Sequence, residues 1–528
     1  MKKVFSLLVL IVCLATIAFP LRPAASNAAE SIAPAVAETK ELGIDDRINE
    51  AMKPVAKKIA AIVFYKLEIG NVALPLTVTW LVLGAVFFTF FFGFINLRGF
   101  THAISLIKGD YDDPNDPGEV NHFQALATAV SGTVGIGNIG GVAVAIGIGG
   151  PGAAFWLFVA GFLGMSSKFV ECTLGVKYRN ENPDGSVSGG PMYYLTKGFE
   201  EKGWGKLGRA LGVWYAVGIV IGCMGIGNMF QSNQAFEQIQ MITGGQAGPL
   251  AGKGLLFGIV MAVIVGMVII GGIKSIAKVT VKVVPFMAIL YIVGASVIIL
   301  MNSKAIPWAF ATIFTNAFSP EGIKGGAIGV MIVGFQRAVF SNEAGLGSAS
   351  IAHSAVQTRE PVTEGIVSLL EPFIDTMVIC MLTALAIITT MHPDFDPNIL
   401  TKYAGKGIEM TSYAFERNIS WSPHIISIAT LLFAFSTMIS WSYYGLKGWT
   451  YLVGEGKWAD LGFKFVFCVF VALGGAAKLG PVLDISDALV FIICVPNILG
   501  LYVLSPVVKK ELVTYFEKIK SGSAVDDC

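Results

Sequence analysis

Charged residues are scarce in this sequence. They make up 14% of the 528 residues, as 36 acidic and 37 basic side chains. Soluble domains carry about 25% charged residues, so these few charges cannot cover the surface of a soluble protein of this length. The net charge of +1 gives no field that would attract a polyanion. The composition therefore excludes an ordinary soluble enzyme, a disordered chain and a nucleic-acid partner.

Histidine and cysteine are also few, with five and seven residues. The histidines are scattered near the ends of apolar runs and lack the spacing of metal ligands. No Ser/His/Asp or Cys/His arrangement indicates hydrolysis, so we expect neither an enzyme nor a resident cofactor. Most of the cysteines sit inside apolar runs, which argues against a disulfide framework: Cys172, Cys223, Cys380, Cys468 and Cys494.

Apolar residues are abundant. They account for 54% of the chain, the mean hydropathy is +0.69, and there are 61 glycines. A membrane-spanning helix needs about 20 mostly apolar residues, and about eleven segments meet that criterion. The sequence therefore predicts an all-α polytopic membrane protein embedded in a lipid bilayer. The predicted spans are 74–96, 121–147, 152–176, 210–234, 254–273, 279–301, 325–355, 364–391, 424–447, 461–479 and 484–507.

The two ends of the chain are expected to lie outside the main domain, which covers residues 74–507. Residues 1–28 have the basic start, the short apolar core and the small residues of a cleaved signal peptide, although an uncleaved first span is the alternative. Residues 29–73 form a predicted extracytoplasmic amphipathic segment, and 508–528 a cytoplasmic tail. Lys and Arg are more frequent in the alternate loops that this orientation places inside, which predicts an outer N-terminus.

Two spans contain stretches that are poor helix formers. Residues 131–141 hold five glycines and Asn138, and residues 340–348 hold Glu343 in mid-span. If the span at 74–96 is peripheral, these are the first and sixth of ten spans. Paired interruptions at corresponding places are typical of inverted-repeat secondary transporters with a leucine-transporter-type 5+5 core. Half-helix N–H groups would then meet a carboxylate, and unwound carbonyls a small cation.

One motif in the first interruption is misleading. Gly135 to Gly140 matches the G-x-G-x-x-G pattern of dinucleotide-binding proteins. That pattern has to follow a buried strand and open a helix in a soluble βαβ unit. Here it lies inside an apolar span, so no nucleotide site is expected.

Several blocks together resemble the alanine or glycine:cation symporter family, also called sodium:alanine symporters. The resemblance extends over about residues 74–507 and implies sodium-coupled import of alanine or glycine, with a ten-helix inverted-repeat core and one added N-terminal helix. The blocks are TVGIGNIGG (133–141), GGPMYY (189–194), GNMFQSN (227–233), FSNEAGLG (340–347) and STMISW (436–441).

The resemblance implies which residues bind the substrate and the coupling ion. The N–H groups near Ile136 and Gly137 would meet the substrate carboxylate, and the carbonyls of Phe340 and Ser341 would receive its amine. The full substrate-binding set is Thr133, Ile136, Gly137, Asn138, Gln231, Phe340, Ser341 and Trp441. The implied sodium-binding set is the carbonyls of Ser131, Val134 and Phe433 with the hydroxyls of Ser436 and Thr437.

The residue chemistry allows alternatives for some of these roles. Carbonyls and hydroxyls are the hard donors that suit sodium, but Ser436 and Thr437 can instead bond back to their own helix. Trp441 shares a helix face with Thr437 and can limit side-chain size, or it can be an interfacial anchor.

Charged side chains inside the spans suggest further interactions. Lys168 and Glu171 lie three residues apart and can pair on one helix face. Glu371 and Asp375 lie four apart and can share a proton or a cation, although a solvated position near the cytoplasmic end is the preferred interpretation. The remaining pair, Arg337 and Glu343, flanks the second interruption as gate partners, or as charges that are separately solvated or locally paired.

We therefore expect a sodium-coupled symporter in the plasma membrane that imports alanine or glycine by alternating access. Its oligomeric state is left open. The alternative mode of transport is coupling to protons, which the two neighbouring acids Glu371 and Asp375 suggest. From other classes, an ion channel or a substrate-sensing receptor remains open.

Overall fold

The computed structural model describes residues 63–69, 72–113, 115–319, 326–403, 407–476 and 491–521, together with a few single residues. The predicted signal peptide and most of the segment 29–73 lie outside the described residues. What is described is mainly helical, as the long apolar segments require. A helix satisfies its own backbone hydrogen bonds, which lipid cannot do.

The helices of the first half follow one another closely. They are α3 (Leu76–Phe91), α4 (Ile95–Arg98), α5 (Phe100–Lys108), α6 (His122–Thr133), the π-helix η1 (Gly137–Gly141), α7 (Val142–Gly149), α8 (Ala153–Lys177), α9 (Pro191–Glu201), α10 (Gly205–Met224), the π-helix η2 (Gly225–Phe230), α11 (Gln231–Ile242), the 3-10 helix η3 (Gly245–Ala247), α12 (Gly254–Ile269) and α13 (Gly272–Met301).

The second half has the same character. It comprises the 3-10 helix η4 (Ser303–Ala305), α14 (Ile306–Ala317), α15 (Gly326–Asn342), α16 (Ala349–His353), α17 (Pro361–Val367), α18 (Leu370–Pro372), the π-helix η5 (Phe373–Cys380), α19 (Met381–Thr390), α20 (Ile399–Lys402), α21 (Gly407–Glu416), α22 (Pro423–Val453), α23 (Lys457–Ala476) and α25 (Cys494–Ser521).

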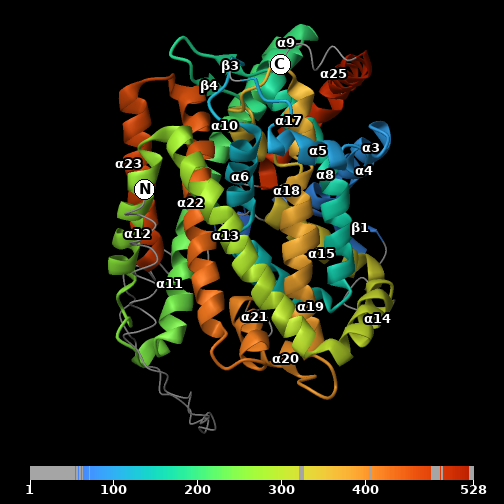
Figure 1. The fold of residues 1–528 in the computed structure, drawn as a ribbon, viewed down its shortest axis with the longest axis vertical. Coiled ribbons are helices and arrows are strands. Elements are labelled where there is room, and N and C mark those ends of the chain that lie inside the picture. The colour runs from blue at the N-terminus through green and yellow to red at the C-terminus, as the bar shows by residue number, and fades with distance from the viewer. Residues whose placement is uncertain are drawn as a thin grey trace.

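Six of the described helices are long and apolar enough to cross a membrane, and a seventh span results if the bent pair α6 and η1–α7 counts as one. The long helices stand side by side along the longest axis of the molecule (Figure 1). In α22, 89% of the apolar window is buried inside the protein, against 33% in α23. Therefore α22 lies in the centre of the bundle and α23 on its periphery.

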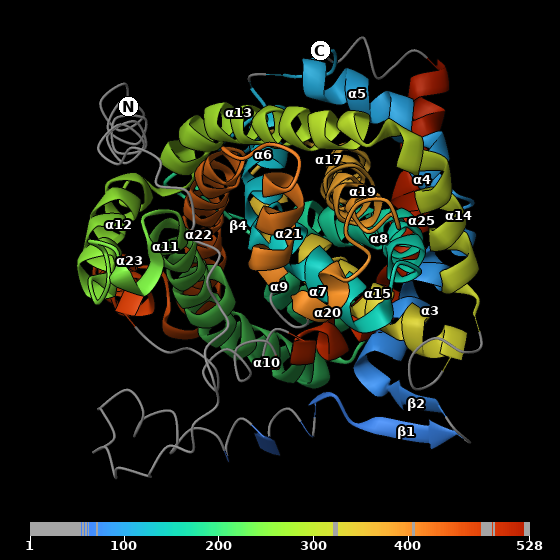
Figure 2. The same cartoon turned by 90° about the horizontal axis from the view of Figure 1, so that it is seen from below.

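Two small sheets lie outside the bundle. Strands β1 (Lys66–Ile69) and β2 (Val72–Pro75) form an antiparallel hairpin at the end of the predicted segment 29–73, whose amphipathic part lies mostly outside the described residues. Strands β3 (Asn180–Glu181) and β4 (Val187–Ser188) pair above the helices, near α9 (Figure 1). At the opposite end, α20 and α21 lie across the bundle in the view from below (Figure 2).

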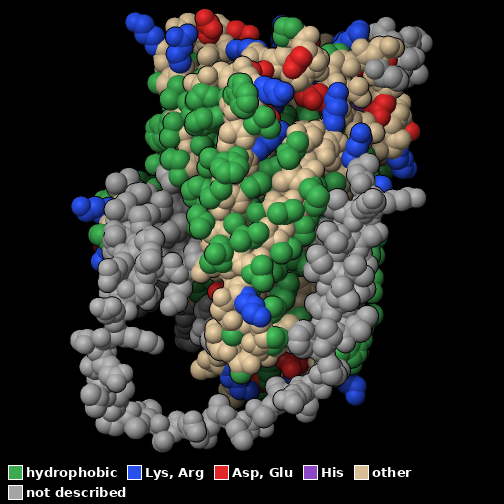
Figure 3. All heavy atoms as spheres, turned by 90° about the vertical axis from the view of Figure 1, so that its left-hand side faces the viewer, with side chains coloured by type: hydrophobic (Ala, Val, Ile, Leu, Met, Phe, Trp, Pro, Cys, Tyr) green, Lys and Arg blue, Asp and Glu red, His purple; other side chains and the backbone are tan. Residues whose placement is uncertain are grey.

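The outer surface has the polarity of a protein in a bilayer. Figure 3 shows hydrophobic side chains over the middle of one long face, with Lys, Arg, Asp and Glu gathered mainly toward the upper end. Large apolar side chains are exposed on peripheral helices, for example Val263, Ile289 and Phe465. In water such an apolar area would be a liability, whereas lipid accepts it.

Seven of the predicted spans correspond to the six long apolar helices and the bent pair and differ from them at the ends, whereas the spans predicted at 74–96 and 254–273 correspond to the shorter apolar helices α3 and α12. The span predicted at 210–234 is longer, because α10, η2 and α11 run continuously from Gly205 to Ile242. Similarly, α25 continues to Ser521, past the predicted end of the last span at 507. Polar residues at these ends hid the helix from a hydropathy criterion.

Helices α12 and α23 pack closely because small residues line their contact. A Cβ atom placed on Gly258 of α12 would lie 2.2 Å from the carbonyl oxygen of Ala472 on α23. Close approach of backbones at small residues is how helices associate inside a membrane, where no hydrophobic force drives them together.

Substitution of Gly258 by alanine is expected to destabilise the protein by about 1–3 kcal/mol, because the new methyl group forces the two backbones apart. The control is Gly266→Ala on the same helix, where the new Cβ would be 3.4 Å from the Sγ atom of Cys468. Thermal unfolding in detergent should show a lower midpoint for G258A and a nearly unchanged one for G266A. Equal midpoints for the two variants would contradict the packing described.

Candidate functional site

The first predicted interruption is a bend within an apolar span. Helix α6 ends at Thr133, Val134 adopts an extended conformation, and the chain resumes as η1 and α7 at an angle of 52°. The N–H groups of Ile136 and Gly137 stand at the start of this second half-helix, where the first N–H groups have no intrahelical acceptor. The unwound residues are thus those that the glycine-rich sequence predicted.

Side chains replace the hydrogen bonds that the bend removes. The Oδ1 atom of Asn138 accepts a hydrogen bond from the N–H of Gly135 at 2.8 Å. The hydroxyl of Thr383 donates to the carbonyl of Asn138 at 2.9 Å, and that of Thr411 to the carbonyl of Ile139 at 2.9 Å. These donors come from α19 and α21, so distant parts of the chain stabilise the interruption.

The second interruption begins slightly later than predicted. Helix α15 continues to Asn342, which leaves the carbonyls of Phe340 and Ser341 in its last turn, where carbonyls have no intrahelical donor. Glu343, with φ of 57°, and Gly345, with φ of 90°, then turn the chain in the left-handed region before α16 starts. The backbone N–H of Ala344 is bound by the side chain of Asn342 at 2.9 Å.

The two interruptions touch each other. A Cβ atom on Gly137 would lie 3.7 Å from both the ring of Phe340 and the Cα of Ser341. The carboxylate of Asp375 on η5 connects them further, because it accepts hydrogen bonds from Asn138 Nδ2 at 2.6 Å and from Ser341 Oγ at 2.9 Å. Four of the predicted substrate-binding residues therefore surround one junction.

Asp375 is the residue of this junction that the sequence interpretation missed. Asp375 and Glu371 were interpreted as solvated near a membrane face, and this was wrong, because both are fully buried. Besides the bonds to the interruptions, Asp375 accepts one from the hydroxyl of Thr376 at 2.7 Å. The signal available in the sequence was an acid inside an apolar span, which calls for an internal partner.

Two buried oxygens without a partner lie beside the first bend. Among the described residues, Thr437 Oγ1 and Gln231 Oε1 have no hydrogen bond. A Cβ atom on Gly135 would be 2.9 Å from that hydroxyl and 3.8 Å from that amide oxygen. Buried oxygens are costly to leave unpaired, so their convergence marks a place suited to a ligand such as a cation or an ammonium group.

The other predicted sodium ligands are close together but already engaged. The hydroxyl of Ser131 donates to the carbonyl of Ser436 at 2.6 Å, so α6 and α22 meet here. The hydroxyl of Ser436 bonds back to the carbonyl of Phe433 at 3.0 Å, the alternative weighed for it. Val134 is buried beside them, with its carbonyl in the unwound segment. Among the predicted sodium ligands, Thr437 therefore has the hydroxyl that a ligand can bind without breaking an existing hydrogen bond.

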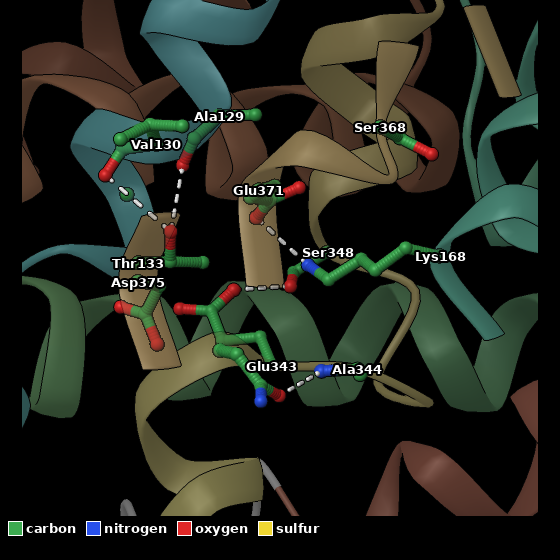
Figure 4. A network of polar contacts seen from close by, with 12 residues as sticks. Ala129, Val130, Thr133, Lys168, Glu343, Ala344, Ser348, Ser368, Glu371 and Asp375 are labelled. Atoms are coloured by element: carbon green, nitrogen blue, oxygen red, sulfur yellow. Dashed lines mark hydrogen bonds and ion pairs between the residues drawn. The ribbon is translucent and has the colours of Figure 1, made fainter. Parts of the chain in front are cut away.

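Trp441 and Thr133 complete the first bend. The indole N–H of Trp441 donates to the carbonyl of Gly132 at 3.2 Å, and the ring is buried against Gly227. Trp441 is therefore an internal residue and not an interfacial anchor. The hydroxyl of Thr133 lies 3.4 Å from the carbonyls of its own helix, at Ala129 and Val130, a weak back-bond that a ligand can replace (Figure 4).

Lys168 on α8 forms a buried ion pair with an acid on α18. Its Nζ atom lies 2.9 Å from Glu371 Oε1. Lys168 therefore pairs with an acid on another helix, α18, and not with Glu171 on its own helix as predicted. Figure 4 shows Lys168 pointing toward Glu371 and Ser348. Ser348 in turn donates to Glu343, which is buried. The separately solvated alternative is therefore wrong for Glu343.

Arg337 lies on α15, before the interruption, and its role as a gate partner of Glu343 stays a prediction.

Glu171, which does not pair with Lys168, accepts hydrogen bonds from the N–H of Gly347 at 3.1 Å and from Asn497 at 2.9 Å. The second interruption is thus held by Glu171 on α8 and by its own Glu343.

Replacement of Asn138 by alanine is expected to lower the unfolding temperature in detergent, because it leaves the buried N–H of Gly135 and the carboxylate of Asp375 with fewer partners, at about 1–3 kcal/mol per group. A suitable control is Asn418→Ala, since that side chain bonds only within its own turn, to the carbonyl of Ala414. A midpoint for N138A equal to that of N418A would show that Asn138 does not stabilise the bend.

Comparisons with known proteins agree with this geometry. A crystal structure of MhsT in complex with L-phenylalanine shares the fold, with a TM-score of 0.52 and 17% identity, covering 73% of this chain and 88% of that one. Sodium/alanine symporter AgcS of Methanococcus maripaludis is 39% identical over 84% of this chain and 95% of its own length. The probable sodium/glutamine symporter GlnT of Bacillus subtilis is 31% identical over 83% and 87%.

The model of the sodium:alanine symporter family matches residues 61–527, nearly the whole described domain. Membership makes the chain a multi-pass membrane transporter and supports symport of sodium with an amino acid. The predicted resemblance is thereby confirmed, and the chain belongs to the sodium:alanine symporter family.

Proposed function

We propose that this chain imports alanine or glycine together with sodium across the plasma membrane, by alternating access. The observation that carries this proposal is the junction of two interrupted helices at Gly137 and Ser341, with the partnerless oxygens of Thr437 and Gln231 beside it. A zwitterion needs donors for its carboxylate and acceptors for its amine at a short separation. Two half-helix ends of opposite polarity supply both.

The substrate is proposed to lie between the two interruptions. The N–H groups of Ile136 and Gly137 begin a half-helix and would donate to the carboxylate, while the carbonyls of Phe340 and Ser341 end one and would accept from the amine. Asp375 adds a negative charge next to Ser341, which favours a cationic amine at that side.

Sodium is proposed to lie between α6 and α22. Thr437 and the unwound carbonyl of Val134 offer uncharged oxygen donors, the ligand type that hard cations prefer. The Ser131 hydroxyl already joins the two helices at this level through the carbonyl of Ser436. A cation held by both helices would fix their relative position, which is a means of coupling its binding to that of the substrate.

A small substrate is favoured by the bulk around the junction. Trp441 is fully buried and so close to Gly227 that a Cβ atom there would meet its ring at 2.3 Å. The ring of Phe340 lies against Gly137. Two aromatic rings with little room to move leave space for a methyl group or a hydrogen in preference to a longer side chain.

Uptake of labelled alanine into proteoliposomes tests the function directly. An inward sodium gradient is expected to drive accumulation, and choline in place of sodium should abolish it, because the coupling ion would be missing. Competition with unlabelled glycine and glutamine reports the size limit. Equal uptake in choline, or glutamine competing as well as alanine, would contradict the coupling or the substrate assignment respectively.

Thr437→Val should raise the sodium concentration for half-maximal uptake by about tenfold or more, since a hydrogen-bonding group facing a charge contributes about 1.5–3 kcal/mol. The maximal rate at saturating sodium should change less. The matched control is Thr450→Val on the same helix, whose hydroxyl bonds back to Lys447. An unchanged sodium dependence in folded T437V would remove this residue from the sodium site.

A further inference from the structure

A chain of buried ionisable side chains runs from one end of the bundle to the second interruption. It starts at Asp112, after α5, and ends at Lys168 on α8. Five helices contribute to it, and its members in between are His122 on α6, Glu364 on α17, His353 on α16 and Glu371 on α18. Apart from Asp112, every side chain in it is at most 2% exposed.

Glu364 is the centre of this chain. One carboxylate oxygen accepts from Nδ1 of His122, and the other lies 2.5 Å from Nδ1 of His353. Each imidazole therefore turns its remaining nitrogen, Nε2, away from Glu364. These nitrogens face further carboxylates: that of His122 lies 3.8 Å from Asp112 Oδ1, and that of His353 lies 3.5 Å from Glu371 Oε2. Neither contact is a hydrogen bond in this structure, and Nε2 of His353 and Oε2 of Glu371 are buried without a hydrogen-bond partner among the described residues.

This alternation of acids and imidazoles is unusual for a purely structural contact. Charged groups inside a membrane are costly, and a neutral hydrogen-bonding pair would fasten the same helices at a lower cost. An imidazole with a carboxylate at both nitrogens can take up a proton at one nitrogen and release a different one at the other. Repeated twice in series, with an acid between, the arrangement has the form of a proton relay.

The two ends of the chain differ in access. The side chain of Asp112 is 35% exposed, so it can exchange protons with solvent at the membrane face near α5. Burial raises the pKa of Asp112 above its ordinary value. At the other end, Lys168 is fully buried and forms the ion pair with Glu371.

We propose that Asp112, His122, Glu364, His353 and Glu371 form a proton pathway from the membrane face near α5 to the ion pair of Lys168. When Asp112 closes its 3.8 Å separation from Nε2 of His122, it gives that nitrogen a proton, and the proton on Nδ1 of the ring moves to Glu364. Glu364 gives a proton to Nδ1 of His353, whose Nε2 proton moves to Glu371 when these two side chains close their 3.5 Å separation. Each step breaks one N–H or O–H bond and forms another, so the net change is one proton moved from Asp112 to Glu371.

Arrival of the proton changes the partner of Lys168. Protonated Glu371 no longer carries the charge that holds the ammonium group. The other acids near Lys168 are Glu171, which binds the N–H of Gly347, and Glu343, which binds Ser348. A shift of Lys168 toward them alters the acids that hold the second interruption, so proton movement would act on the helix that contacts the proposed substrate.

Other titratable and charged groups also face this chain. They come from the helices and loops packed around it. They are His102, Glu171, Cys172, Arg179, Glu343 and Asp375. The relay goes beyond the sodium-coupled function proposed above and does not depend on the identity of the substrate.

The pH dependence of transport by the full-length chain tests the pathway. Sodium-driven uptake of labelled alanine is measured in proteoliposomes with the same pH on both sides, between about pH 5 and 8, where imidazoles change charge. Each series is run in H₂O and in D₂O. The wild type is expected to show a pH-dependent rate and a slower rate in D₂O. A wild-type rate that changes with neither pH nor D₂O would overturn the proposal.

Two variants and one control locate the effect. In Glu364→Gln, the ratio of the rates at the two ends of the pH range should fall to about one and the D₂O effect should vanish, while Glu364→Asp should restore both. His102→Gln is the control, because this imidazole lies at the same end of the bundle but bonds to Tyr515 outside the chain. H102Q should keep the wild-type profile.

A merely structural role of Glu364 predicts a different result. In that case E364Q would lower the rate equally at every pH and keep the D₂O effect, which would overturn the relay. If E364Q does not fold, His122→Gln gives the same readout from the outer end. Equilibrium sodium-dependent binding of labelled alanine, measured in parallel, separates failure of the relay from failure of the proposed symport.

Discussion

Every backbone N–H and carbonyl inside a bilayer has to find a partner within the protein, and the rest of this structure depends on how that constraint is met at the two interruptions. Asn138 binds the N–H of Gly135, and threonines on α19 and α21 bind the carbonyls of Asn138 and Ile139. The bend is therefore not a local property of a glycine-rich stretch. It exists because segments more than 200 residues away supply the missing hydrogen bonds.

The same requirement explains why the two interruptions behave as one site. The side-chain oxygen of Asn138 accepts from the N–H of Gly135 in the first bend, and its side-chain NH₂ group donates to Asp375. Asp375 also accepts a hydrogen bond from Ser341 of the second interrupted helix. Any ligand that displaces one of these bonds changes the partners of the others, since a buried carboxylate cannot be left unsatisfied. A substrate bound at either helix, as proposed, would therefore act on the other helix through Asp375.

The sequence allowed prediction of the features that depend on local composition. Five glycines in 131–141 and an acid at Glu343 were sufficient to locate both interruptions, because each is a poor fit to a helix wherever it packs. Features that depend on the depth of a residue in the membrane, or on contacts with residues far away in the sequence, could not be predicted. Lys168 pairs with Glu371 on another helix and not with Glu171 on its own, and only the packing of α8 against α18 decides between them.

The distribution of polar groups between helices connects these points. Buried ion pairs and acid–imidazole contacts join α6, α8, α16, α17 and α18, so separating these helices would expose or isolate charges at a high cost. Thr437 and Gln231 belong to α22 and α11, outside that charged set, and face it across Gly135 with partnerless oxygens. A set of helices locked by charge therefore meets a second set through glycine and neutral hydrogen bonds, such as that of Ser131 with the carbonyl of Ser436, and no buried ion pair of the described residues has to be broken when these two sets part there. Since a cation bound across that surface adds contacts only while the two sets are together, ion binding has a direct physical means of biasing their relative position.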